Sequence, residues 1–254
     1  MSRWSADPLR IGLAPGEIAL RQGSALRRLN SESPGLAALL PLLDSALDDA
    51  AWSLRRIEIV LSQHFVRQIL TPPPGKALSR GEESALAAAS LREVYGEDAD
   101  SWQISVHSQP PHAGLLGAAI DRVPLAGLET LLARHDCRRY SVAPLASRAV
   151  GQLPAHFDGW WVAVEPGRAT LMGRHAGVWQ HLAAQPVDDH WRDSLPDWLE
   201  HEAACAAVPI PAHVWIQPVG LGAVGSIAHT GWQWQVLPHD AQVRGAAALA
   251  GMTP

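Results

Sequence analysis

Apolar and polar positions follow one pattern in two segments of the chain, residues 11–20 and residues 162–171. In each segment, short apolar stretches flank a Pro-Gly dipeptide, which is typical of a β-hairpin with a tight turn. The segments align without a gap, so Pro15 corresponds to Pro166. This repetition predicts a duplicated fold, and a chance match between two short hairpins is the alternative.

In the first half of the chain, β-branched and apolar runs alternate with helical patterns. We expect a hairpin over residues 9–21, strands over 57–61, 65–70, 102–107, 115–120 and 140–143, and helices over 36–47, 82–95, 125–135 and 146–153. The strand over 65–70 is expected to pair with the strand over 57–61 across a short turn. Ser79 and Glu82 form a capping-box pattern that starts the second helix, and Gly96 ends it.

The second half repeats this order in a shorter form. We expect a hairpin over 160–164 and 169–173, a strand over 178–183, a helix over 188–205 with Pro196 near its middle, and strands over 213–218 and 232–237. Three antiparallel strands followed by alternating helices and strands, present twice, is the order of two RNase H-like lobes. We therefore predict an α/β, actin-like fold with a duplicated RNase H-like lobe, each lobe having a mixed sheet opened by a β-hairpin and flanked by helices. Residues 1–153 form the first predicted lobe and residues 154–254 the second.

Composition narrows the functional classes. The 254-residue chain has a formal net charge of −5 and no run of Lys or Arg, which argues against nucleic acid as a partner. Its longest apolar run, residues 36–43, is far shorter than the ~20 residues of a membrane span, and residues 1–8 show no apolar signal-peptide core. We expect a cytoplasmic protein in which Cys137 and Cys205 are reduced thiols.

Tryptophan is the unusual component, with 11 residues against two Phe and two Tyr. Most lie in the second half, where Trp232, Trp234 and Val236 share one face of a predicted strand. We expect these rings to belong to the core, and an exposed aromatic surface that binds a partner is the alternative.

Several segments resemble the cytoplasmic actin-like proteins of type IV pilus and type II secretion assembly platforms, the PilM and GspL group. They are residues 61–67 (LSQHFVR), residues 82–96, Trp102 ahead of a strand, and residues 116–121 (LGAAID). The resemblance is best over about residues 9 to 150. It implies a cytoplasmic scaffold, peripheral to the inner membrane, that docks on the tail of an inner-membrane partner and on a pilus or secretion ATPase.

This resemblance raises the question of nucleotide binding. In actin-like ATPases the first hairpin of each lobe is a phosphate loop, with an acid at the strand end and Gly with Ser or Thr in the turn. Here Ala14 stands at the acid position of the first hairpin, and proline removes one backbone donor from each turn. Glu165 stands at the acid position of the second hairpin. We expect a degenerate site that does not hydrolyse ATP, and therefore no enzymatic activity.

A glycine pattern in the second half instead favours nucleotide binding. Gly220, Gly222 and Gly225 spell G-x-G-x-x-G after the strand over 213–218. We do not expect a Rossmann domain, because the pattern lies too near the end of the sequence for a βαβ unit to follow. In an actin-like lobe, a Gly-rich turn here is where adenosine packs, so these glycines and Glu165 are candidate remnants of an ATP site. A flexible loop without ligand is the alternative, and no cofactor is expected.

Other candidate chemistry is weaker. His201 and Cys205 lie one helical turn apart, as in H-E-x-x-H, but Cys replaces the second His and no third ligand stands out, so no metal site is predicted. Asp193, Asp197 and Glu200 form an acidic stripe typical of a solvated helix face. The first hypothesis is a silent scaffold. The alternative is an active actin-like ATPase or a sugar-kinase-like phosphotransferase, and the two differ at Ala14 and Glu165.

Overall fold

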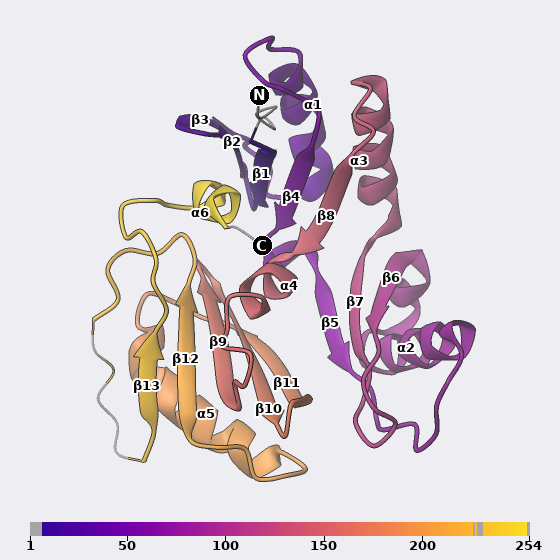
Figure 1. Ribbon diagram of the computed structural model, residues 1–254, viewed down its shortest axis with the longest axis vertical. Coiled ribbons are helices and arrows are strands. Elements are labelled where there is room, and N and C mark those ends of the chain that lie inside the picture. The colour runs from indigo at the N-terminus through magenta and orange to yellow at the C-terminus, as the bar shows by residue number, and fades with distance from the viewer. Residues whose placement is uncertain (1–6, 226, 228–230, 253–254) are drawn as a thin grey trace, which may run out of the picture. The chain divides into compact units, whose positions relative to one another are not determined.

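The computed structural model describes residues 7–225, 227 and 231–252 (Figure 1). Residues 1–6, which carry most of the segment examined for a signal peptide, lie outside the described residues. Contacts group the chain into two compact units, each made of separate segments. The first comprises Met1–Val66, Asp121–Gln152 and Val243–Pro254, and the second comprises Arg67–Ile120 and Leu153–Gln242.

The first unit contains a five-stranded sheet in the order β3-β2-β1-β4-β8. Its strands are β1 (Leu9–Ala14), β2 (Glu17–Gln22), β3 (Ala25–Asn30), β4 (Ile57–Leu61) and β8 (Tyr140–Pro144), and its helices are α1 (Leu36–Leu47), α3 (Arg122–Arg134), α4 (Leu145–Val150) and α6 (Ala246–Gly251). The strands β1, β2 and β3 are antiparallel, whereas β4 and β8 run parallel to β1. This mixed sheet opens with the predicted hairpin.

Burial explains the centre of this sheet. Every residue of β4 is buried, as expected for a strand with neighbours on both edges and cover on both faces. On β1, Leu9, Ile11 and Leu13 are fully buried on one face. Gly12 alternates with them, and α6 lies so close to it that an added Cβ would be 2.0 Å from the carbonyl oxygen of Ala246. Figure 1 shows α6 beside β1 and β2.

The second unit contains a five-stranded sheet in the order β11-β10-β9-β12-β13, covered by helix α5 (Trp191–Cys205). Its strands are β9 (Gly159–Glu165), β10 (Arg168–His175), β11 (Val178–Pro186), β12 (His213–Pro218) and β13 (Gln233–Val236). Three antiparallel strands and two parallel strands stand in the same order as in the first sheet. The predicted duplication and the predicted fold class are thereby confirmed.

A smaller three-stranded sheet also belongs to the second unit, in the order β5-β7-β6. It consists of β5 (Arg67–Leu70), β6 (Trp102–His107) and β7 (Leu116–Asp121), and it packs against α2 (Arg80–Tyr95), which is followed by the short helix η2 (Gly96–Ser101). Ser79 caps α2 with Glu82 in the predicted capping box. This helix therefore begins where its sequence pattern predicts.

The predicted pairing of residues 65–70 with 57–61 is wrong. The strand β5 pairs antiparallel with β7, while both edges of β4 are occupied by β1 and β8. The backbone N–H of Ser62 donates to the carbonyl oxygen of Leu13, and η1 (Gln63–Phe65) follows. Because β4 has no free edge, the chain cannot fold back onto it after this turn.

Tryptophan side chains behave as core residues throughout the described part of the chain, where all ten are buried or half-buried. Trp160 lies in the core between α5 and the second sheet, and Trp232 and Trp234 pack against that core. In the described residues, no helix combines the length and apolar character needed to cross a membrane.

One junction between the compact units falls at residues 152 and 153, beside the boundary predicted at residue 153. Residues 67–120 group with the second sheet, however, and residues 243–254 group with the first. The division into lobes of residues 1–153 and 154–254 therefore stays a prediction.

Candidate functional site

The first hairpin turn is built around Pro15 and Gly16. Ala14 ends β1 and pairs with Glu17 at the start of β2, so the turn contains two residues. Gly16 has a φ of 71°, and proline before a glycine of positive φ is the pattern of a type II turn. At the strand end where an actin-like ATPase requires an acid, the chain presents the methyl group of Ala14. This turn cannot hold a cation through a carboxylate.

The carboxylate next to the first turn has another role. Oε2 of Glu17 accepts a hydrogen bond of 3.0 Å from the backbone N–H of Ala246, the first residue of α6. Gly245, with a φ of 53°, lies so close that an added Cβ would be 1.8 Å from Oε2 of Glu17. The side chain that follows the first turn therefore fixes the C-terminal helix to the hairpin.

The second turn has the same geometry with different charges. Gly167 has a φ of 80°, and Glu165 pairs across the hairpin with Arg168. Glu165 is buried. Burial of the guanidinium lowers the pKa of Arg168, and Arg67 lowers it further, while Tyr95 and Glu165 raise it. The acid that sequence analysis identified thus has a cation directly across the turn.

The Gly-rich loop starts at the same edge of the second sheet. The backbone N–H of Val219 donates to the carbonyl oxygen of Val164 over 2.9 Å, which places the beginning of the loop beside the end of β9. Gly220 follows with a φ of 69°. Because β9 and β12 are parallel, Glu165 and Gly220 both lie at the carboxyl ends of neighbouring strands, where open α/β sheets bind ligands.

The other two glycines lie farther along the loop. The carbonyl oxygen of Gly222 is 3.3 Å from Nε2 of His239, and an added Cβ on Gly225 would be 3.9 Å from Arg192 of α5. The structure therefore brings Glu165 and Gly220 to one edge, while Gly222 and Gly225 continue towards His239 and α5. The whole glycine pattern, residues 220–225, lies within the described part of the chain.

Arg168 is the residue of this site that sequence analysis missed. A signal for it was present, because a two-residue turn necessarily places the residue after Gly167 opposite Glu165. The Pro-Gly pattern predicts the hairpin, and the register of that hairpin brings its two flanking charges together.

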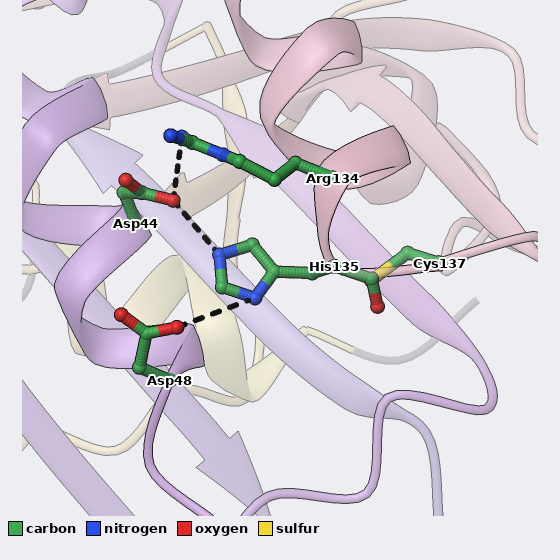
Figure 2. A network of polar contacts seen from close by, with 5 residues as sticks. All are labelled: Asp44, Asp48, Arg134, His135 and Cys137. Carbon is green, nitrogen blue, oxygen red and sulfur yellow. Dashed lines mark hydrogen bonds and ion pairs between the residues drawn. The ribbon is translucent and has the colours of Figure 1, made fainter.

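A network of polar contacts joins the helices α1 and α3 (Figure 2). Oδ1 of Asp44, on α1, contacts Nε2 of His135 at 2.8 Å and the guanidinium of Arg134 at 2.6 Å, and Oδ1 of Asp48 lies 3.8 Å from Nδ1 of His135. These contacts join the C-terminal ends of α1 and α3. Cys137 beside them is buried, and burial is the main cause that raises the pKa of its thiol. The network therefore lacks an activated nucleophile.

Two other kinds of candidate site, a Ser62–His64 pair and a group of metal ligands, also lack catalytic geometry. Oγ of Ser62 accepts a hydrogen bond from the backbone N–H of His64, so Ser62 caps a local turn. Nowhere in the described ranges do three His, Cys, Asp or Glu side chains converge as metal ligands. Ser62 and His64 therefore do not act as a nucleophile and its base, and the described residues contain no formed metal centre.

No protein-family model matches the chain, and no curated protein matches it at a significant level. Solved structures do. The chain is similar to the cytoplasmic domain of EpsL, an inner membrane component of the type II secretion system of Vibrio cholerae, with 15% identity, a TM-score of 0.53 and coverage of 95% of this chain and 92% of that chain.

Two further structures support the same fold. A Bacteroides thetaiotaomicron protein with an actin-like ATPase fold and unknown function has 9% identity, a TM-score of 0.54 and coverage of 88% and 86%. A chain of the PilM–PilN type IV pilus biogenesis complex has 14% identity, a TM-score of 0.52 and coverage of 85% and 82%. At these identities the likeness shows the fold alone. A secretion protein and a pilus protein share this fold with the chain, as the resemblance in the sequence predicts. The chain therefore has the actin-like fold.

Proposed function

We propose that this chain is a non-catalytic cytoplasmic scaffold of a type IV pilus or type II secretion assembly platform. In this role it docks the tail of an inner-membrane partner, the assembly ATPase, or both, and stays peripheral to the inner membrane through these partners. The similarity to the EpsL cytoplasmic domain and to the PilM–PilN complex supports the class of machine. Fold alone does not assign chemistry, so the argument for a silent scaffold rests on the hairpins.

The observation that carries the proposal is the composition of the two turns. Fast phosphoryl transfer in this class of fold depends on a bound cation and on backbone donors that cradle phosphate oxygens. Pro15 and Pro166 have no N–H and Ala14 has no carboxylate, so each of these residues removes a part of the machinery. Glu165 keeps its carboxylate, and the strand register places the cationic Arg168 opposite it. Neither turn is therefore a complete phosphate loop.

The proposal places any remaining nucleotide contact at Glu165, Gly220, Gly222 and Gly225. The common edge of Glu165 and Gly220 favours this location over any other in the second sheet. The alternative function, an active actin-like ATPase or a sugar-kinase-like phosphotransferase, requires these residues to bind ATP with Mg²⁺ productively.

Calorimetric titration of the full chain with ATP and Mg²⁺, together with an assay of phosphate release, separates these functions. The scaffold proposal predicts no phosphate release above the rate without protein and no binding that depends on Mg²⁺. Glu165→Gln is the diagnostic variant, and Glu129→Gln, at an exposed position of α3, is its control. Micromolar binding that Glu165→Gln abolishes and Glu129→Gln preserves would overturn the scaffold proposal.

The scaffold role has its own positive test. Synthetic peptides with the sequences of the cytoplasmic tails of inner-membrane proteins from the same pilus or secretion system are titrated with the chain, and binding is followed by fluorescence anisotropy without nucleotide. We expect one tail to bind, with an affinity that added ATP and Mg²⁺ leave unchanged. If no tail and no assembly ATPase binds, the docking proposal is wrong.

A further inference from the structure

His201 and Cys205 form a pair of metal-binding side chains at the C-terminal end of α5. Nε2 of His201 lies 3.8 Å from Sγ of Cys205, and both residues are exposed. In a tetrahedral zinc site with ordinary Zn–S and Zn–N bond lengths, the two ligand atoms are about 3.6 Å apart. The pair therefore already has close to the separation that a shared zinc ion requires.

The two side chains select one class of ion. A thiolate and a neutral imidazole are ligands that favour zinc and similar divalent ions over Mg²⁺ or Ca²⁺. Cys205 is the last residue of α5, and His201 lies one helical turn before it, so both ligands belong to the same end of the helix.

The chain does not complete this site by itself. Glu202, the nearest acidic neighbour in sequence, uses Oε2 to contact Nε2 of His181 at 2.6 Å and Oε1 to accept the indole N–H of Trp198 at 2.9 Å. Within the part of the chain that the structure describes, no group of three metal-binding residues exists. A four-coordinate site therefore needs two ligands from outside this chain.

We propose that His201 and Cys205 are half of an intermolecular zinc site, and that the same pair from a second copy of this chain supplies the other two ligands. A two-fold axis through the ion makes the four ligands Cys₂His₂, a common structural zinc set. On binding, the S–H bond of each Cys205 breaks, a sulfur–metal bond forms, and the proton passes to solvent, so one ion releases two protons. Each imidazole donates the lone pair of Nε2 and keeps its proton on Nδ1.

Cobalt titration of the reduced, metal-free full chain tests this site, because Co²⁺ replaces Zn²⁺ and reports its ligands by absorption. We expect a sulfur-to-cobalt charge-transfer band that saturates at one ion per two chains, a doubled mass in sedimentation, and loss of the band when Zn²⁺ is added. Cys205→Ser should abolish the band, and His201→Ala should weaken binding at least about tenfold. His107→Ala, which changes another exposed histidine, is the control and should bind like the natural chain.

The outcomes separate the site from its completion by a second copy. A missing band, or a band that persists in Cys205→Ser, overturns the proposed ligand pair. Saturation at one ion per chain without a change of mass overturns the intermolecular site. Both substituted residues are exposed, so unchanged circular dichroism of the variants confirms that loss of binding is not loss of folding. The proposal stands apart from the scaffold role, and neither result alters the nucleotide test.

Discussion

At the scale of single residues, burial decides which side chains are free to react. Cys137 and Cys205 are the two thiols of the chain, and only Cys205 is exposed. Burial, with a smaller contribution from Asp136, raises the pKa of Cys137 and so lowers the fraction of reactive thiolate at any given pH. Sequence analysis predicted two reduced thiols but had no means to rank them, because their exposure depends on contacts with distant residues.

The thiols should therefore react at very different rates. In the presence of a chelator, we expect an aromatic disulfide reagent to modify one thiol per chain rapidly at pH 8, and the second only after denaturation. Mass spectrometry of the modified peptides should locate the fast reaction at Cys205. Equal rates at the two thiols in the native chain would contradict the burial of Cys137.

Gly12 is a second residue whose role depends on a distant partner. Because an added Cβ would be 2.0 Å from the carbonyl oxygen of Ala246, Gly12→Ala should displace α6 and lower the free energy of unfolding by about 1–3 kcal/mol. Urea denaturation measures the difference. The matched control is Gly81→Ala in α2, where no atom lies within 4 Å, and which should leave stability unchanged or raise it by up to about 1 kcal/mol. Equal effects of the two changes would exclude close packing as the cause.

At the scale of elements, predictions succeeded where local pattern determines structure. The bounds of α1 and β4 match the expected ranges, and α2 starts at its predicted cap. The predicted order includes a third antiparallel strand without a residue range, and this strand is β3. Its position was not predicted because β3 lies at a sheet edge with most of its residues exposed, which weakens alternation. The helix α6 was missed because Ala246–Gly251 has no polar face, and its conformation is stabilised by contact with β1 and β2.

The cap of α2 predicts a pH dependence. Two hydrogen bonds with Ser79 lower the pKa of Glu82 from an ordinary value of 4.5. The bond from the backbone N–H of Ser79 has the larger effect, and the bond with the Ser79 side chain has the smaller. A carboxylate whose pKa is lower in the folded state adds stability above its unfolded pKa and loses that contribution as the pH falls. Glu82→Gln should therefore melt below the natural chain at pH 7, and the difference should shrink below pH 4. A difference that is constant between pH 7 and pH 3 would argue against the ionised cap.

The contact between α1 and α3 is a second prediction at this scale. Asp44→Ala removes the shared partner of Arg134 and His135 and should lower the free energy of unfolding by about 1–2 kcal/mol, since it leaves Nε2 of a nearly buried imidazole without its hydrogen-bond partner. Arg138→Ala breaks a fully exposed ion pair with Asp136 and should cost less than about 0.5 kcal/mol. Chemical denaturation of both variants makes the comparison. Equal losses would show that Asp44 contributes no more than a surface charge.

At the scale of the whole molecule, the duplicated hairpins predicted the architecture, but they did not predict the pairings between distant segments. The Pro-Gly turns identified both sheets and the acid at Glu165. The partner strand of β5, the return of α6 to Gly12, and the position of Gly220 beside the end of β9 all depend on long-range contacts. The candidate site was thus half predicted. Its residues were named from the sequence, and their proximity came from the topology.

One such long-range contact within the second unit is made by Gln109. Its Oε1 accepts the backbone N–H of Trp179 at 2.7 Å, and its Nε2 donates to the carbonyl oxygens of Trp179 at 3.1 Å and of Gly114 at 2.6 Å. The side-chain amide thus bonds to the edge of β11 as one peptide group of an added strand would. It connects the loop after β6 to the second sheet.

Gln109→Ala should therefore leave the N–H of Trp179 without its partner and open this edge locally. We expect hydrogen exchange at the Trp179 amide to accelerate at least about tenfold, whereas exchange at Val162, in the centre of β9, should stay unchanged because that strand pairs on both edges. Gln103→Ala, at an exposed position of β6, is the matched control. Acceleration at both amides would mean that the variant loses global stability. An unchanged Trp179 would mean that packing of its buried ring, and not the Gln109 amide, holds the loop to the sheet.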